Sequence, residues 1–177
     1  MNRFSMTIFA ALAAAGAMYA QAPPAPQTEI TVLKAAYTLI KTNLTKAADR
    51  MPEDQYGFKA SPDIRTFGAL IGHIADVQGR ICSAASGVTP GTASAEKDLT
   101  KKADLVAALK ASFDTCDPVF NGLGDDDSSK MMSLGRGAPR SKVATLWQFI
   151  IGHSNEEYGY LSVYMRIKGI VPPSTQP

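Results

Sequence analysis

The chain has 177 residues, of which 45% are hydrophobic and 19% charged, and its formal net charge is +2. This length and apolar content predict one globular domain that buries a core of its own. Acidic and basic residues are mixed along the sequence, so it lacks the basic face that nucleic acids require, and we expect no nucleic-acid partner.

The N-terminus differs in composition from the rest of the chain. An apolar, alanine-rich run from Phe4 to Ala20 follows Arg3 and precedes a segment rich in proline and alanine. A short apolar run that ends in small residues is typical of a secretory signal peptide. We therefore predict that residues 1–22 are a signal peptide and that residues 23–177 form a single domain, periplasmic or secreted. The membrane is then involved only in export; an uncleaved membrane anchor is the alternative.

Four segments have the apolar spacing of amphipathic helices, and no segment reads as a credible strand. The first can be capped by Thr28 and is ended by Pro52. The longest connection, residues 123–140, fits either a functional lid or a plain surface excursion. Four such helices predict an all-α four-helix bundle. The expected bounds are Thr28 to Met51, Asp63 to Ala85, Thr100 to Gly122 and Leu146 to Ile170.

Export affects how the two cysteines, Cys82 and Cys116, are interpreted. In an oxidising compartment such a pair favours a disulfide, with two buried unbridged cysteines as the alternative. Cys82 lies near the end of the second expected helix and Cys116 in the C-terminal half of the third. A bridge therefore requires these two middle helices to run parallel, and the connection from Ser86 to Asp98 is long enough to return along a bundle.

Two polar residues interrupt the expected apolar face of the last helix. His153 and Glu157 lie one turn apart on that face, where they can reach a common atom. An ionised Glu buried alone would cost several kcal/mol, so something must compensate it. The face is expected to contain Leu146, Ile150, His153, Glu157, Tyr160, Tyr164 and Ile167.

The only other histidine, His73, repeats the local tripeptide Ile-Gly-His of His153. A glycine beside each histidine leaves room for a neighbouring helix or a bound group. We predict a three-ligand metal site formed by His73, His153 and Glu157. Zinc, nickel, iron and manganese all suit two imidazoles and a carboxylate.

Other interpretations of these residues stay open. Each histidine could be a hydrogen-bonded core residue, and Glu157 could pair with Arg166 or Lys168 or face solvent. Asp76 lies one turn from His73 and could orient it or replace Glu157 as a ligand. Tyr160 could donate a hydrogen bond to a bound ligand or be a core residue, and we expect Trp147 to pack in the core. The side chains of Asn155 and Glu156 should face away from the site.

Two stretches resemble a known family. GHSNEEYGYL followed by YMRIKGIVPPS is similar to the last helix of DinB-like proteins, the DinB/YfiT group of metal-binding four-helix bundles, and FKASPDIRTFGALIGHIADVQ resembles that group's second helix. The resemblance implies parallel middle helices, as a cysteine bridge would. It also implies a divalent ion, such as zinc or nickel, held by one histidine of the second helix and two of the last, spaced four apart. His73 and His153 match this pattern, whereas Glu157 stands in the third position and departs from it.

Characterised relatives in this group include thiol-dependent S-transferases and isomerases and metal-dependent hydrolases. Together with the predicted export, the resemblance implies an exported metal-dependent hydrolase or transferase that acts on an unknown small molecule. A homodimer is a further, separate expectation. The alternative is a non-catalytic structural or binding bundle with a degenerate metal site. Thiol transfer fits export less well, because low-molecular-weight thiol cofactors are mainly cytosolic.

Overall fold

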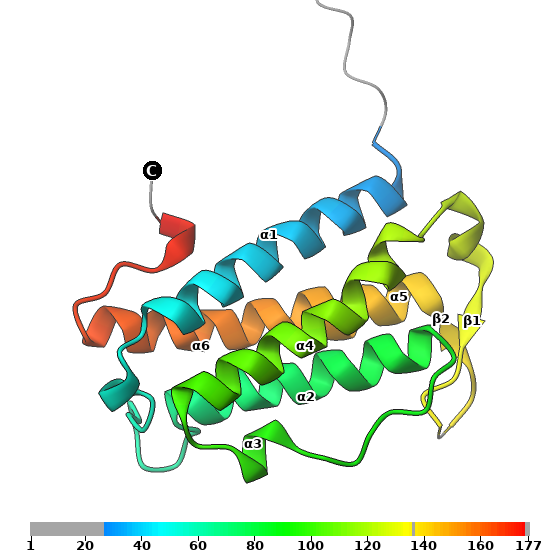
Figure 1. Cartoon of the computed structure of the whole chain (residues 1–177). Helices are drawn as coiled ribbons and strands as arrows, with labels where there is room; N and C mark the ends of the chain where they lie inside the picture. The colour runs from blue at the N-terminus through cyan, green and yellow to red at the C-terminus, as the bar shows by residue number, and fades with distance from the viewer. Residues whose placement is uncertain (1–26, 136, 176–177) are drawn as a thin grey trace, which may run out of the picture.

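The computed structural model describes residues 27–135 and 137–175. The predicted signal peptide, residues 1–22, lies outside the described residues. Four long helical rods pack around one core (Figure 1), which confirms the all-α four-helix bundle. The rods are α1 (Glu29–Arg50), α2 (Phe67–Ala85), α4 (Lys102–Asn121) and a last helix made of α5 (Lys142–Leu146), the π-helical segment η3 (Trp147–Gly152) and α6 (His153–Ile167).

Local chemistry sets the ends of the first two helices. The hydroxyl of Thr28 accepts a hydrogen bond from the backbone N–H of Thr31, so Thr28 caps α1 as predicted. Helix α2 begins later than expected, because Thr66 and not Asp63 is its N-cap. The inner faces of both helices are apolar and buried, as amphipathic spacing predicts.

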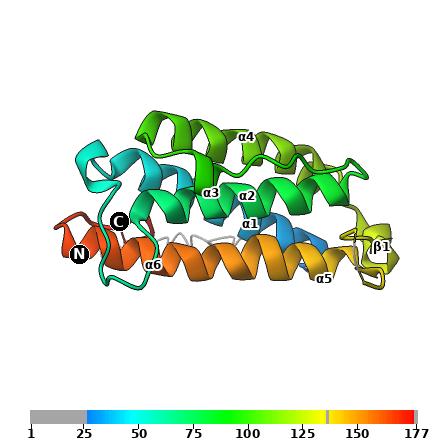
Figure 2. The ribbon, with the colours of Figure 1, turned by 90° about the horizontal axis from the view of Figure 1, so that it is seen from below.

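Helices α2 and α4 run in the same direction, and α1 and the last helix run opposite to them (Figures 1 and 2). Cys82 of α2 and Cys116 of α4 form a disulfide with a Cα–Cα distance of 5.0 Å. Both the predicted bridge and the parallel middle helices are therefore confirmed. Among the described residues, no helix combines the length and apolar character needed to cross a membrane.

The connections contain more structure than the sequence suggested. The chain returning from α2 to α4 forms the short helix α3 (Ala95–Asp98). The expectation of no strand is wrong, since β1 (Met131–Met132) pairs antiparallel with β2 (Arg140–Ser141). Two-residue strands are too short to show an alternating pattern in sequence. The described residues also form three 3-10 turns: η1 (Glu53–Gln55), η2 (Asp125–Ser129) and η4 (Pro173–Thr175).

The last helix begins at Lys142 and its buried face differs from the expected one. Tyr160 is 48% exposed and Ile167 56%, so both core assignments are wrong. The expected face repeats every 3.5 residues, whereas a straight α-helix has 3.6 residues per turn. Residues at the expected spacing therefore rotate away from the core along the helix. Trp147, also expected in the core, is 48% exposed at the start of η3, where hydrogen bonds span five residues and α-helical spacing does not apply. The buried stripe passes instead through Ser154, Tyr158, Leu161 and Met165.

Candidate metal centre

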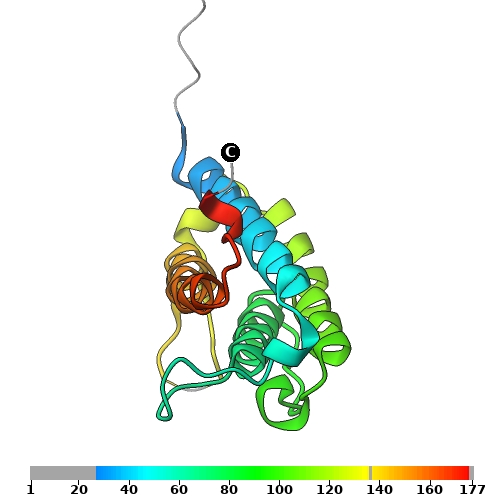
Figure 3. The same cartoon turned by 90° about the vertical axis from the view of Figure 1, so that its left-hand side faces the viewer.

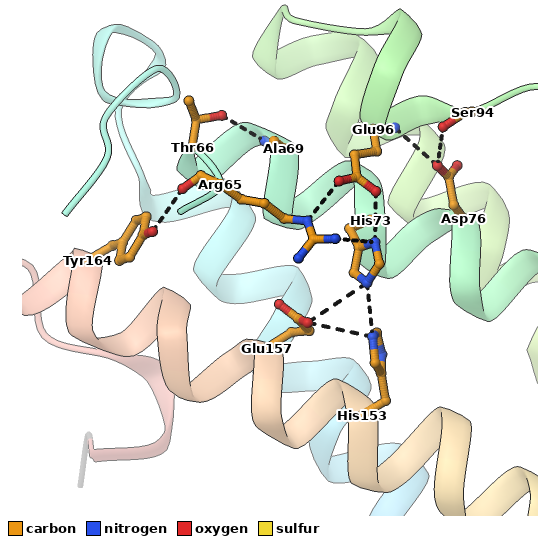
Figure 4. A network of polar contacts seen from close by, with 10 residues as sticks. All are labelled: Arg65, Thr66, Ala69, His73, Asp76, Ser94, Glu96, His153, Glu157 and Tyr164. Atoms are coloured by element: carbon orange, nitrogen blue, oxygen red, sulfur yellow. Dashed lines mark hydrogen bonds and ion pairs between the residues drawn. The ribbon is translucent and has the colours of Figure 1, made fainter. Parts of the chain in front are cut away.

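The structure brings the three predicted ligands together (Figure 4). His73 reaches from α2 towards α6, which carries His153 and Glu157 one turn apart. The two Nε2 atoms lie 3.1 Å apart, and Oε1 of Glu157 lies 3.8 Å from His73 Nε2 and 3.6 Å from His153 Nε2. Glu157 is buried and the histidines are partly exposed, so the cluster borders on solvent.

The size of this triangle suits a metal ion. Its sides of 3.1, 3.6 and 3.8 Å place a point about 2.0 Å from all three donor atoms. Zinc is bound by histidine nitrogen and by carboxylate oxygen at about 2.0 to 2.2 Å. These three side chains could therefore hold one divalent ion with no further convergence of α2 and α6.

The polar atoms of the cluster are not satisfied by the protein alone. Oε2 of Glu157 and Nδ1 of His153 are buried without a hydrogen-bond partner in the described part of the chain. Burial raises the pKa of Glu157, and burial together with the neighbouring His73 lowers the pKa of His153. Both effects disfavour the charged forms. A cation would compensate an ionised Glu157 and would accept the lone pair on Nε2 of a neutral His153, so these donors fit a metal. Nδ1 of His153 points away from the cluster atoms and is not satisfied by such an ion.

Glu96 fixes the orientation of His73. Its Oε2 lies 2.8 Å from Nδ1 of His73, and its Oε1 accepts a hydrogen bond from Nε of Arg65 at 2.7 Å. Burial opposes ionisation of Glu96, but the hydrogen bonds from Arg65 and His73 outweigh it and lower the pKa of this carboxyl. An ionised carboxylate only accepts hydrogen bonds, so Nδ1 of His73 is the donor. The lone pair of Nε2 then faces His153 and Glu157, as a metal ligand requires.

Helix α3 positions Glu96. The carboxylate of Asp76 accepts hydrogen bonds from the Ser94 hydroxyl at 2.7 Å and from the backbone N–H groups of Ala95 at 2.7 Å and Glu96 at 3.2 Å. A Cβ added at Gly72 would lie 2.7 Å from Cα of Glu96, so α3 rests directly on the glycine beside His73. The space predicted at this glycine is therefore used by a neighbouring helix.

The remaining candidates do not join the cluster. Asp76 serves α3 rather than His73, and Tyr160 is exposed on the outer face of α6. Asn155 and Glu156 are exposed beside the site, as expected, with the Asn155 amide bonded to the carbonyl of Ile151. The expected alternative partners of Glu157 are engaged elsewhere: Arg166 donates to Thr175, and Lys168 lies over the ring of Phe58.

Sequence reasoning missed Glu96 and Arg65. Glu96 lies in a connection without apolar periodicity. No sequence spacing relates a single carboxylate there to His73, which precedes it by 23 residues. Arg65 directly precedes the cap of α2, and its backbone carbonyl accepts a hydrogen bond from the Tyr164 hydroxyl at 2.8 Å. Only the tertiary structure brings these residues to His73.

The fold and the cluster define a class: a four-helix bundle with a candidate metal centre between its second and last long helices. The family profile of the DinB superfamily matches residues 36–161, most of the chain. The chain belongs to the DinB superfamily.

Solved structures agree on the fold. The chain is similar to a DinB-like protein from Bacillus cereus ATCC 10987, with a TM-score of 0.68 and 18% identity over 81% of this chain and 95% of that chain. It is also similar to a conserved protein from Enterococcus faecalis, with a TM-score of 0.62 and 12% identity over 80% of this chain and 98% of that chain. At these identities the likeness concerns the fold alone. No functionally curated protein matches the chain.

Proposed function

We propose that this protein is an exported, metal-dependent hydrolase that binds one divalent ion through His73, His153 and Glu157. The observation that carries the proposal is the triangle of donor atoms, whose sides of 3.1, 3.6 and 3.8 Å match a single ion. The buried Glu157 supports it, because its second oxygen has no partner in the described part of the chain. Three protein ligands leave at least one coordination position for a substrate.

Each side chain has a definite part in this proposal. A divalent ion bound here would act as a Lewis acid that polarises a carbonyl or phosphoryl oxygen of the substrate. Glu157 supplies one negative charge that offsets the ion, and Glu96 holds the ring of His73 with its Nε2 towards the centre. Arg65 keeps Glu96 ionised through the hydrogen bond of 2.7 Å and lies beside the same imidazole.

Hydrolysis fits the proposed location better than thiol transfer does. The Cys82–Cys116 bridge is compatible with an oxidising compartment, and the first 22 residues have the composition of a signal peptide. Water is the only co-substrate that hydrolysis needs, whereas low-molecular-weight thiols are mainly cytosolic. N-terminal sequencing of protein recovered from the periplasm or medium tests the export: a mature chain starting at Gln21 or Pro23 supports it, and full-length protein confined to the cytoplasm contradicts it.

Metal analysis of protein purified without a histidine tag tests the function. We expect about one equivalent of a divalent metal in the wild type. The metal should be lost in both His73→Ala and His153→Ala and kept in Tyr160→Phe, which alters an exposed residue of the same helix. Turnover of a panel of chromogenic esters, amides and phosphate esters should stop on chelation and return with metal. Wild-type protein that is metal-free, and whose thermal midpoint is unchanged by added metals, would instead support the non-catalytic bundle.

A further inference from the structure

A cavity of about 790 Å³ lies at the β1–β2 end of the bundle. Its walls come from the C-terminal end of α2, the turn that follows it, the β1–β2 hairpin and Phe149 of the last helix. Figure 2 shows the hairpin beside the end of the bundle where α2 finishes. The volume lies within the range of about 300 to 1,000 Å³ typical of small-molecule sites.

The cavity lies along the same pair of helices as the candidate metal centre. Arg80 follows His73 by seven residues on α2, two turns and about 10.5 Å along the helix axis. On the last helix Phe149 precedes His153 by four residues. Helix α2 and the last helix lie side by side over this length, and Figure 3 shows the two rods end-on as neighbours. A small molecule in the cavity would therefore lie about one helical turn from His153 along the last helix and about two turns from His73 along α2.

The walls combine apolar surface with positive charge. Val88 and Met131 are 59% and 60% exposed, and Leu134 and Phe149 add further apolar area. None of the described lining residues is acidic, and three are basic: Arg80, Lys130 and Lys142.

Only part of this positive charge is neutralised. Lys142 and Lys130 share the carboxylate of Asp127, at 2.9 and 3.3 Å. Arg80 is exposed and makes no ion pair with any residue that the structure describes. Among the residues that the structure describes, the cavity therefore combines apolar walls with the unpaired guanidinium of Arg80, and a guanidinium is the group that best matches a carboxylate by paired hydrogen bonds.

We propose that this cavity binds an organic carboxylate with an apolar body, of the size of a medium-chain fatty acid, and that Arg80 holds its carboxylate. The apolar body would lie against Val88, Met131 and Leu134. The inference does not depend on the proposed function: a free carboxylate has no bond to hydrolyse, so at the metal centre it would be a product released from an ester or amide. Binding itself needs no metal and is tested without one.

The experiment is a calorimetric titration of decanoate and of decanol into the disulfide-intact, metal-stripped protein. Decanoate should bind more tightly than decanol, because only decanoate can pair with Arg80. Arg80→Gln should weaken decanoate binding by about tenfold or more and leave decanol unchanged. Val88→Glu should weaken decanoate more than Val88→Gln does, because it adds a negative charge to the wall at an exposed position.

The control is Arg166→Gln, which removes an exposed arginine bonded only to Thr175 near the opposite end of the last helix. Equal losses in Arg80→Gln and Arg166→Gln, unchanged decanoate binding in Arg80→Gln, or no saturation by decanoate would overturn the proposal. Tighter binding of decyl phosphate than of decanoate would overturn the assignment of a carboxylate.

The two proposals fail in different ways. If the wild-type protein is purified without metal and still binds decanoate through Arg80, the proposed enzyme function fails and the proposed carboxylate site stands. If the protein binds one equivalent of metal but does not bind decanoate, the proposed carboxylate site fails and the proposed metal site stands. Metal content should be the same in Arg80→Gln and in the wild type, because Arg80 lies about two turns from His73 along α2 and makes no hydrogen bond or ion pair with the three ligands in the described structure.

Discussion

Nδ1 of His73 lies 2.8 Å from Oε2 of Glu96, a residue that belongs to neither of the two helices carrying the candidate ligands. Arg65 donates a hydrogen bond to the carboxylate of Glu96, and the carboxylate of Asp76 on α2 accepts one from the backbone N–H of Glu96. A hydrogen bond of this kind fixes both the rotation of the imidazole and the nitrogen that carries its proton.

The first prediction concerns this contact. Glu96→Gln removes the negative charge while keeping the shape of the side chain, and we expect metal affinity to fall by about 10- to 100-fold. Competition with a chromophoric chelator measures the dissociation constant. Glu156→Gln, an exposed change beside Glu157, should bind metal as the wild type does. Equal affinities in all three proteins would show that Glu96 plays no part in the site.

Gly72→Ala tests the seating of α3. The added Cβ would lie 2.7 Å from the backbone of Glu96, so α3 must shift, and we expect a loss of about 1 to 3 kcal/mol in the free energy of unfolding. The matched control is Gly79→Ala on the same helix, where a Cβ meets nothing within 4 Å. That change should stabilise the protein by up to about 1 kcal/mol through helix propensity. Urea denaturation measures both, and the same sign for the two variants would contradict the close contact.

Glu157→Gln should reverse its effect on stability between metal-free and metal-loaded protein. Without metal, Oε2 of the buried carboxylate has no partner among the residues that the structure describes. The neutral amide should therefore unfold at an equal or higher urea concentration than the wild type. With excess metal only the wild type should gain stability, because binding to the native state alone stabilises it. A wild type that gains nothing from any divalent metal would exclude Glu157 as a ligand.

Removing the disulfide should cost about 3 to 4 kcal/mol, because the Cys82–Cys116 bridge closes a loop with a sequence separation of 34. The double variant Cys82→Ala/Cys116→Ala and the wild type under reducing agent should lose similar amounts in urea denaturation. A double variant as stable as the oxidised wild type would show that the bridge constrains the unfolded chain very little.

Asp127 should make stability depend on pH. Its buried carboxylate accepts hydrogen bonds from the backbone N–H of Gly124 and from Lys142, and these hold its pKa well below the ordinary value. The stabilisation is therefore fully present above the unfolded-state pKa of about 3.9 and is lost as pH falls towards the lower folded-state pKa.

We expect Asp127→Asn to cost about 2 kcal/mol at pH 7 and much less near pH 2, as measured by urea denaturation across this range. Asp126→Asn, an exposed neighbour, is the control and should change stability little at any pH. A difference between wild type and Asp127→Asn that does not depend on pH would contradict the lowered pKa.

Much of the scaffold was predictable because its determinants are local or periodic. Apolar spacing alone predicts a helix with one buried face between Thr28 and Met51, and the cysteine pair predicts that α2 and α4 run parallel. His153 and Glu157 could be paired from helical spacing alone, and His73 was the only other histidine available.

The errors follow from departures from that regularity. A spacing of 3.5 residues per turn predicts a core position for Tyr160, but the straight helix α6 does not keep that spacing. Trp147 lies in a π-helical segment, where α-helical spacing does not apply. The role of Glu96 is not predictable from the sequence, because it depends on α3 packing against Gly72 and Asp76. No periodic pattern in the sequence relates these two segments.

The parallel arrangement of α2 and α4 has a consequence for engineering. Neighbours that point the same way cannot be joined by a tight turn, so the chain between residues 86 and 101 has to travel back, and Glu96 lies on that route. Shortening loops is a common way to raise thermostability, but it does not suit this segment. A shorter connection would remove Glu96 from His73 even if the four helices still packed together.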